Sequence, residues 1–90
     1  MFFVYVLYSY KDGKLYVGYA EDVDARFVRH AAGHVPATKD RRPLELIYYE
    51  AYRTESEAKR REKFLKGGNG HTQLKVQLEA TLKTLGYRFL

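Results

Sequence analysis

The stretch from residue 2 to residue 20, FFVYVLYSYKDGKLYVGYA, decides the fold of this chain. Residues 2–9 are rich in aromatic and β-branched side chains on both faces, a pattern typical of a strand that is covered on both sides. Residues 11–13, Lys-Asp-Gly, supply turn chemistry, and residues 15–20 form a second strand-like run. The stretch therefore predicts a β-hairpin whose first strand is central in its sheet.

The register of this hairpin decides whether two of its tyrosines lie together. If the loop holds an even number of residues centred on Asp12 and Gly13, Tyr5 and Tyr16 share a sheet face, about four residues apart along the strands. An odd loop or a bulge would change that arrangement. Gly18, two residues after Tyr16, weakens a strand and is typical of a position where another group approaches the backbone closely.

The rest of the chain alternates between helical and strand patterns. Asp22 can cap a helix that runs to about Ala32 and ends at Gly33. Residues 34–43 hold both prolines and several cations, and such a loop is either a binding element or an ordinary solvated connection. Residues 44–52 predict a third strand.

Two further helices are expected after that strand. Residues 54–57, Thr-Glu-Ser-Glu, have the spacing of a capping box, and the helix they open is expected to end at Gly67-Gly68. A last helix ends at Gly86 and presents a core stripe of Leu74, Leu78, Leu82 and Leu85. The order predicts one α+β domain over residues 1–90, with a small, largely antiparallel three-stranded sheet flanked by helices in the order β-β-α-β-α-α.

Composition narrows the partners and the compartment. Sixteen Lys and Arg against eleven Asp and Glu give a net charge of +5, a balance that favours an anionic partner such as nucleic acid. The absence of cysteine excludes disulfides and thiolate metal sites. The apolar run from Phe2 to Tyr8 is too short to span a bilayer and lacks the features of a signal peptide, so we expect a cytoplasmic protein without a membrane partner.

One acidic residue falls on an apolar helix face. Glu62 lies between Ala58 and Leu65, four residues after the first and three before the second, so its carboxylate points along the stripe that should face the sheet. A carboxylate there needs a cation, and a hard divalent metal ion is one candidate. The alternative is a salt bridge within the same helix, to Arg60, Arg61 or Lys66.

Two basic residues repeat this pattern in the first helix. Arg26 comes three residues after Val23, and His30 comes three residues after Phe27, which places both on or beside the inward face and one turn apart. Together they could address one anion, because Arg grips two phosphate oxygens and His exchanges a proton near neutral pH. A structural arginine paired to an acid and a structural histidine would give the same pattern.

Read together, these residues resemble the GIY-YIG nuclease family, which includes the incision subunit of bacterial excision repair and many small single-domain bacterial proteins. Residues 3–5, Phe-Val-Tyr, stand where the family has Gly-Ile-Tyr, and residues 16–18, Tyr-Val-Gly, match the second signature. Arg26 and His30 match the first helix, and residues 61–63, Arg-Glu-Lys, match the place of the metal-binding glutamate. Phe3 departs from the first glycine and leaves the tyrosine intact.

The resemblance implies a GIY-YIG fold and a magnesium- or manganese-dependent DNA endonuclease. Glu62 would anchor the metal, and Arg26 would hold a non-bridging phosphate oxygen. Tyr16 or Tyr5, helped by His30, would position and deprotonate the attacking water. The residues expected to contact nucleic acid, mainly at phosphates, are Gly18, Tyr19, Lys39, Arg41, Arg42, Arg60, Arg61, Lys63 and Lys66.

The expected enzyme is structure-selective or of low sequence specificity, with a place in DNA repair or recombination, and a partner protein could supply specificity. Two other functions stay open. One is a non-catalytic nucleic-acid-binding module that keeps the fold. The other is an interaction protein whose tyrosines and basic helix dock an acidic partner.

Overall fold

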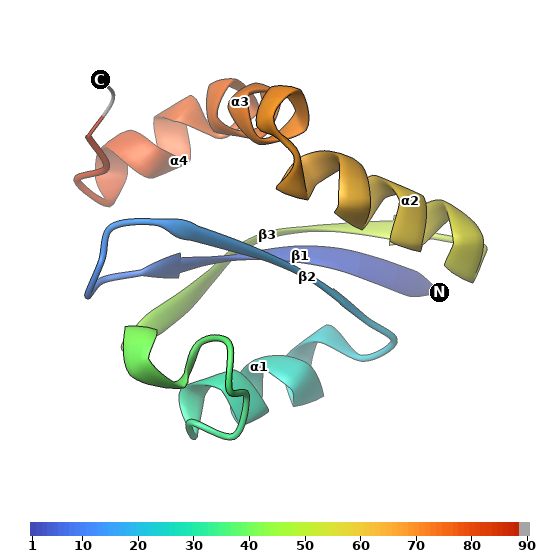
Figure 1. Cartoon of the computed structure of the whole chain (residues 1–90), viewed down its shortest axis with the longest axis horizontal. Helices are drawn as coiled ribbons and strands as arrows, with labels where there is room; N and C mark the ends of the chain where they lie inside the picture. The colour runs from blue at the N-terminus through green and yellow to red at the C-terminus, as the bar shows by residue number, and fades with distance from the viewer. Residues whose placement is uncertain (89–90) are drawn as a thin grey trace.

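The chain folds into three layers, with a sheet between two groups of helices (Figure 1). The computed structural model describes residues 1–88. In chain order its elements are β1 (Phe2–Ser9), β2 (Leu15–Ala20), α1 (Val23–Ala31), the short 3-10 helix η1 (Lys39–Arg41), β3 (Leu44–Tyr52), α2 (Glu55–Lys66), α3 (Gly68–Gln77) and α4 (Glu79–Thr84). Helix α1 covers one face of the sheet, and α2, α3 and α4 cover the other (Figure 1). The α+β class and the three-stranded antiparallel sheet are confirmed.

Strand β1 is central, as the sequence predicts. The strand order is β2-β1-β3, and both pairings are antiparallel. From Val4 to Ser9 every residue of β1 is buried, because neighbouring strands cover both edges and helices cover both faces. Such a strand buries apolar side chains on both sides, which explains its unbroken hydrophobic run.

Side chains of β1 alternate between two hydrophobic clusters. Val4 and Val6 pack with the helices α2, α3 and α4, together with a second set of buried residues, Ala58, Leu65, Leu74, Leu78 and Leu82. Tyr5 and Leu7 pack on the α1 side, with Val23 of α1. The predicted leucine stripe is therefore core, and Tyr5 belongs to the opposite face.

The hairpin register differs from the expected one by the position of its turn. Ser9 donates its backbone N–H to the carbonyl of Lys14 at 3.0 Å, so the loop has an even number of residues but is centred one residue earlier than Asp12 and Gly13. Tyr5 pairs with Gly18, and Leu7 pairs with Tyr16. Tyr5 and Tyr16 therefore do share a face, as diagonal neighbours two residues apart rather than four.

The side chain of Ser9 helps to explain this shift. Its hydroxyl accepts the backbone N–H of Asp12 at 3.1 Å, and its carbonyl accepts the N–H of Gly13 at 2.9 Å. Gly13 takes a positive φ of 69°, which closes the loop immediately before Lys14. The turn is thus fixed by a serine that the turn motif itself does not include.

The helix ends follow their sequence signals, with one difference. The carboxylate of Asp22 accepts the N–H of Ala25 at 3.0 Å, and Gly33 ends α1 with a φ of 82°. Thr54 caps α2 by accepting the N–H of Glu57 at 3.3 Å. The expected last helix is divided into α3 and α4 at Leu78, which stays buried at the bend and keeps the leucine stripe on the core. Within residues 1–88, no helix combines the length and apolarity that crossing a membrane requires.

Candidate active site

The first part of the site is a tyrosine that lies across a glycine. A Cβ atom built on Gly18 would lie 2.4 Å from both Cζ and the hydroxyl oxygen of Tyr5, far inside van der Waals contact. Gly18 therefore makes room for the phenol of its cross-strand partner. The sequence indicates a close approach at Gly18, and the structure identifies the approaching group as Tyr5. Contact of Gly18 with nucleic acid stays a prediction.

A chain of buried side chains continues from this phenol. The hydroxyl of Tyr5 lies 2.7 Å from Nε2 of His30, and Nδ1 of His30 lies 2.6 Å from the hydroxyl oxygen of Thr38. Tyr5 is 1% exposed, and His30 and Thr38 are fully buried. The ring of Tyr16 packs at an angle against both rings, 5.2 Å from His30 and 6.3 Å from Tyr5 between centroids. Strand β2, strand β1, helix α1 and the loop before η1 thus meet at one point.

Arg26 reaches the same point with an unsatisfied donor. In the part of the chain that the structure describes, the Nε atom of Arg26 is the buried side-chain polar atom without a hydrogen-bond partner. Its charge influences the pKa of both Tyr5 and His30, so the guanidinium lies beside both. A buried donor without a partner costs free energy, which an anion bound at this place would recover.

Burial sets the protonation of the two buried rings. Removal from water, with a smaller contribution from the charge of Arg26, lowers the pKa of His30 to about 4. Burial also raises the pKa of Tyr5, helped by the charges of Tyr16 and Glu62 and opposed by Arg26. At neutral pH, His30 is therefore uncharged and Tyr5 keeps its proton.

These protonation states assign the tautomer of His30. The guanidinium of Arg26 can only donate, so the proton of the buried Tyr5 hydroxyl has Nε2 of His30 as its acceptor. Nε2 then carries no proton, and Nδ1 donates to the hydroxyl oxygen of Thr38. Thr38 is the N-cap residue of η1, but its side chain makes no capping hydrogen bond there. Its hydroxyl is used on His30 instead.

Sequence reasoning did not find Thr38. A threonine eight residues after a histidine has no helical or strand relation to it, and only the fold of the connecting loop brings the two together. That loop is held by Arg41, whose guanidinium pairs with Asp12 at 2.6 Å and whose carbonyl accepts the hydroxyl of Ser9 at 2.6 Å. The ion pair lowers the pKa of Asp12 to about 2.

Glu62 lies where the helical pattern places it. Its side chain is 22% exposed, between the fully buried Ala58 and the 1% exposed Leu65. The carboxylate pairs with Lys66 at 3.0 Å, which is the intrahelical alternative that the sequence left open. Its charge is also among the causes that raise the pKa of Tyr5 and Tyr19, so it faces the β1–β2 hairpin.

The residues around Glu62 fit only a metal ion that takes most of its ligands from water and the substrate. Within residues 1–88, no group of three or more His, Asp or Glu side chains is placed to hold a metal ion. Magnesium is commonly bound through one or two carboxylates, with water and substrate phosphates as the other ligands. One partly buried carboxylate fits that pattern, and it does not fit a closed structural metal site.

The predicted nucleic-acid contacts fall into two groups. Three arginines are used within the fold: Arg41 on Asp12, Arg42 on the carbonyl of Lys39, and Arg61 in a two-point pair with Glu50 at 2.9 and 3.1 Å. Lys66 pairs with Glu62. The side chains of Lys39, Arg60 and Lys63 have no ion pair or hydrogen bond with any described residue.

Tyr19 lies apart from the two site tyrosines. It packs on the α2 side of the sheet, where its hydroxyl donates to Glu55 at 3.1 Å and the ammonium of Lys59 lies 5.3 Å from its ring centroid. Loss of water contact and the neighbouring Glu55 raise its pKa to about 12. Its expected contact with nucleic acid would be made from that opposite face.

Known proteins resemble this chain in sequence and in structure. The profile of the GIY-YIG catalytic domain matches residues 1–75. The chain belongs to the GIY-YIG family. Relatives of similar sequence are UPF0213 proteins of Staphylococcus epidermidis, 47% identical over 82% of this chain and 90% of the relative, and of Staphylococcus aureus, 51% identical over 67% of this chain and 73% of the relative. The solution NMR structure of a UPF0213 protein from Bacillus halodurans is 36% identical, with a TM-score of 0.53 over 87% of this chain and 85% of that one.

The buried His30 predicts a specific dependence of stability on pH. Its pKa is about 6.5 in an unfolded chain and about 4 in the fold, so the unfolded state takes up the proton first as the pH falls. The free energy of unfolding should therefore fall between about pH 6.5 and 4. Urea denaturation at pH 7 and pH 5 should show a smaller loss in His30→Gln than in the wild type. Equal losses would contradict the burial of a neutral histidine.

The role of Thr38 can be tested with matched variants. Thr38→Val keeps the shape but removes the acceptor for Nδ1, so the nitrogen shifts of His30 in NMR spectra should show a second tautomer. Thr38→Ser should restore the single tautomer. Thr72→Val is the control, because the hydroxyl of Thr72 bonds only to its own helix, at the carbonyl of Gly68. A single, wild-type tautomer in Thr38→Val would contradict the assigned hydrogen bond.

Proposed function

We propose that this GIY-YIG protein is a metal-dependent endonuclease that hydrolyses DNA phosphodiester bonds. The observation that carries the proposal is the buried, unpartnered Nε of Arg26 beside Tyr5 and a neutral His30, with the ring of Tyr16 packed against both of those rings. An arginine in this state is suited to a planar, two-point contact with a phosphate. Family membership supports nuclease chemistry on DNA.

Glu62 is the residue proposed to hold the ion, Mg²⁺ or Mn²⁺. When bound, such an ion supplies neutralisation of phosphate charge and activation of water. Lys66, which pairs with the carboxylate, lies on the surface with a 51% exposed side chain and can move aside. Helices α2 and α1 cover opposite faces of the sheet (Figure 1), but the charge of Glu62 still contributes to raising the pKa of Tyr5, which supports one shared site.

Arg26 is proposed to hold a non-bridging oxygen of the scissile phosphate. The guanidinium lies beside Tyr5 and His30 before substrate arrives, so it is placed to stabilise negative charge on a phosphate as that charge develops. Its fork also orients the phosphate, because two parallel donors fix the plane of the group that they bind.

The structure supports Tyr16 as the phenol that faces the attacking water. Tyr16 lies on edge strand β2, is partly exposed, and its hydroxyl has no hydrogen-bond partner among residues 1–88. Tyr5 is buried and donates its proton to His30, so it is better suited to hold the neighbouring ring in place. His30 keeps a low pKa and thus acts as an acceptor that orients Tyr5 rather than as a positive charge.

Substrate binding is proposed to rest mainly on phosphate contacts. Among the predicted contact residues, the cations with free side chains are Lys39, Arg60 and Lys63, and these are the first candidates. The paired arginines and Lys66 can contribute only part of their donors. Phosphate contacts position a duplex without reading its sequence. We therefore propose structure-selective or low-specificity cleavage in the cytoplasm, in DNA repair or recombination, with specificity supplied by DNA shape or by a partner protein.

One observation favours a second candidate function. The ion pair with Lys66 gives Glu62 a partner within its own helix, and a module that binds nucleic acid without cutting it could keep the residue for that role. The variant Glu62→Ala distinguishes the two functions, because Glu62 is essential to cleavage and not to binding.

The first experiment measures nicking of supercoiled plasmid and of branched oligonucleotides. We expect cleavage with Mg²⁺ or Mn²⁺, none with EDTA, and a loss to background in Glu62→Ala. Glu79→Ala is the control, since Glu79 also pairs with a lysine four residues later but lies on α4. Salt-sensitive binding without cleavage of any substrate would support the binding module instead.

Arginine geometry gives a second prediction. Arg26→Lys keeps the charge but loses the two-point fork, so the rate of single-turnover cleavage should fall by roughly a hundredfold. DNA affinity should change much less, because other cations supply most of it. A wild-type rate in Arg26→Lys would remove Arg26 from the proposed chemistry.

A further inference from the structure

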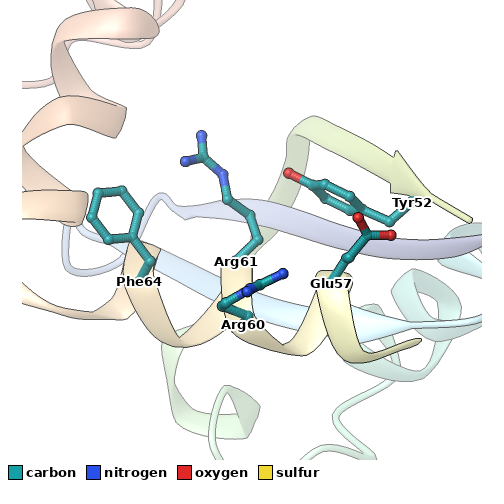
Figure 2. A pocket seen from close by; sticks show the side chains of 5 residues that line it. All are labelled: Tyr52, Glu57, Arg60, Arg61 and Phe64. Atoms are coloured by element: carbon teal, nitrogen blue, oxygen red, sulfur yellow. The ribbon is translucent and has the colours of Figure 1, made fainter. Parts of the chain in front are cut away.

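A second polar and aromatic surface lies on the far side of the helix that carries Glu62. Arg60 and Phe64 are each two residues from Glu62, and two residues turn an α-helix by roughly 200°, so both point away from it. Figure 2 shows Arg60, Arg61 and Phe64 projecting from α2, with Tyr52 reaching toward them from β3. These side chains line a hollow of about 380 Å³.

A second hollow shares the ridge formed by Arg60 and Phe64. It has a volume of about 440 Å³ and is lined also by Lys63 and by residues 67–70, Gly-Gly-Asn-Gly. Gly70 is required by the fold, since a Cβ there would lie 1.9 Å from the carbonyl oxygen of Phe64. Gly68 is not, because it has no left-handed backbone and nothing within 4 Å of a Cβ. The packing of the fold therefore does not require a glycine at position 68, and the space beside it is open.

Phe64 is exposed and yet held in place. Its side chain is 41% exposed, while the core side of α2 is formed by Ala58 and Leu65. The guanidinium carbon of Arg61 lies 5.5 Å from its ring centroid, and Arg61 is itself fixed by its two-point pair with Glu50. A rigid, exposed ring can accept a flat partner at a low entropic cost.

The charges around this ring favour an anionic partner. Arg60 and Lys63 have no ion pair with any residue between 1 and 88. Arg60 lines both hollows with its charge unpaired, and Lys63 lines the second. Among residues 1–88, Glu57 is the one acid that lines either hollow, and it accepts a hydrogen bond from Thr54. An exposed aromatic ring between free cations is the arrangement that proteins use to bind unpaired nucleotides, with bases stacked on the ring and phosphates on the cations.

The opposite case occurs elsewhere on the same molecule. Tyr49 is 56% exposed, but the hollow that it lines also contains three carboxylates, those of Glu21, Asp22 and Asp24. That surface would repel a phosphate backbone. Charge therefore separates two exposed aromatic side chains, one suited to nucleic acid and the other unsuited.

We infer that the surface formed by Arg60, Lys63 and Phe64, here called the Phe64 ridge, binds an unpaired DNA strand next to the duplex that is cut. A base of the unpaired strand stacks on Phe64, and Arg60 and Lys63 hold its phosphates. This inference rests on the proposed nuclease function and gives its substrate class: branched or flapped DNA rather than plain duplex, whose bases are already stacked inside.

The test compares binding of two DNAs in EDTA, so that cleavage does not interfere. One is a fluorescent duplex, and the other carries the same paired sequence with an unpaired flap. The wild type should bind the flapped DNA more tightly. Phe64→Ala and Phe64→Leu should lose that preference by about 5- to 100-fold, the effect of one lost base stack, and leave duplex binding unchanged. Tyr49→Ala is the matched control and should keep the preference.

Three outcomes would overturn the inference. The first is equal affinity of the wild type for the two DNAs. The second is a preference for flapped DNA that survives in both Phe64 variants. The third is displacement of bound flapped DNA by a polyglutamate peptide but not by an unpaired oligonucleotide. Cleavage assays on the same DNAs separate this from the proposed function. Flap binding that needs Phe64, without any cleavage, would overturn only the nuclease. Cleavage that needs Glu62, with no effect of Phe64, would overturn only the ridge.

Discussion

The alternation of side chains along β1 is the constraint on which the site depends. Even-numbered residues such as Val4 and Val6 enter the core under α2 to α4, so Tyr5 must enter the layer beneath α1. A slip of one residue would exchange the two faces and bring Tyr5 under α2, away from His30. The packing that stabilises the sheet therefore also fixes the side on which Tyr5 meets His30.

Local patterns allowed most of the fold to be predicted, because helix caps, turns and hydrophobic periods act within a few residues. The bounds of β1, β2 and β3 and the caps at Asp22 and Gly33 follow from such patterns. The turn was misplaced by one residue because Ser9, outside the turn motif, supplies two of its hydrogen bonds. The division of the last helix at Leu78 has no local signal.

Prediction of the site divided along the same line. Helical spacing correctly placed Glu62 beside Ala58 and Leu65. Strand periodicity allowed Tyr5 and Tyr16 to share a face only if the loop was even, and the observed register meets that condition. The sequence carries no local signal for Thr38, because its hydrogen bond to His30 forms only when the loop between them has folded. Partners of charged groups were equally hidden, as they come from other elements.

Those partners change what the basic composition means. Arg41 and Arg61 hold the loop before β3 and the β3–α2 contact through Asp12 and Glu50, so they act as internal ties. The pair with Glu50 is reinforced by hydroxyl hydrogen bonds from two tyrosines of β3, Tyr48 and Tyr52. Counting cations therefore overstates the charge that a ligand would meet, and the free cations mark smaller surfaces.

The close approach of Tyr5 to Gly18 has a consequence for how such a site can vary between descendants of one sequence. Because the phenol occupies the space of a missing Cβ, any side chain at position 18 would push the hydroxyl out of reach of His30. A smaller residue at position 5 would in turn leave a void above the glycine. Positions 5 and 18 are therefore expected to change together, because a substitution at either one requires a compensating substitution at the other.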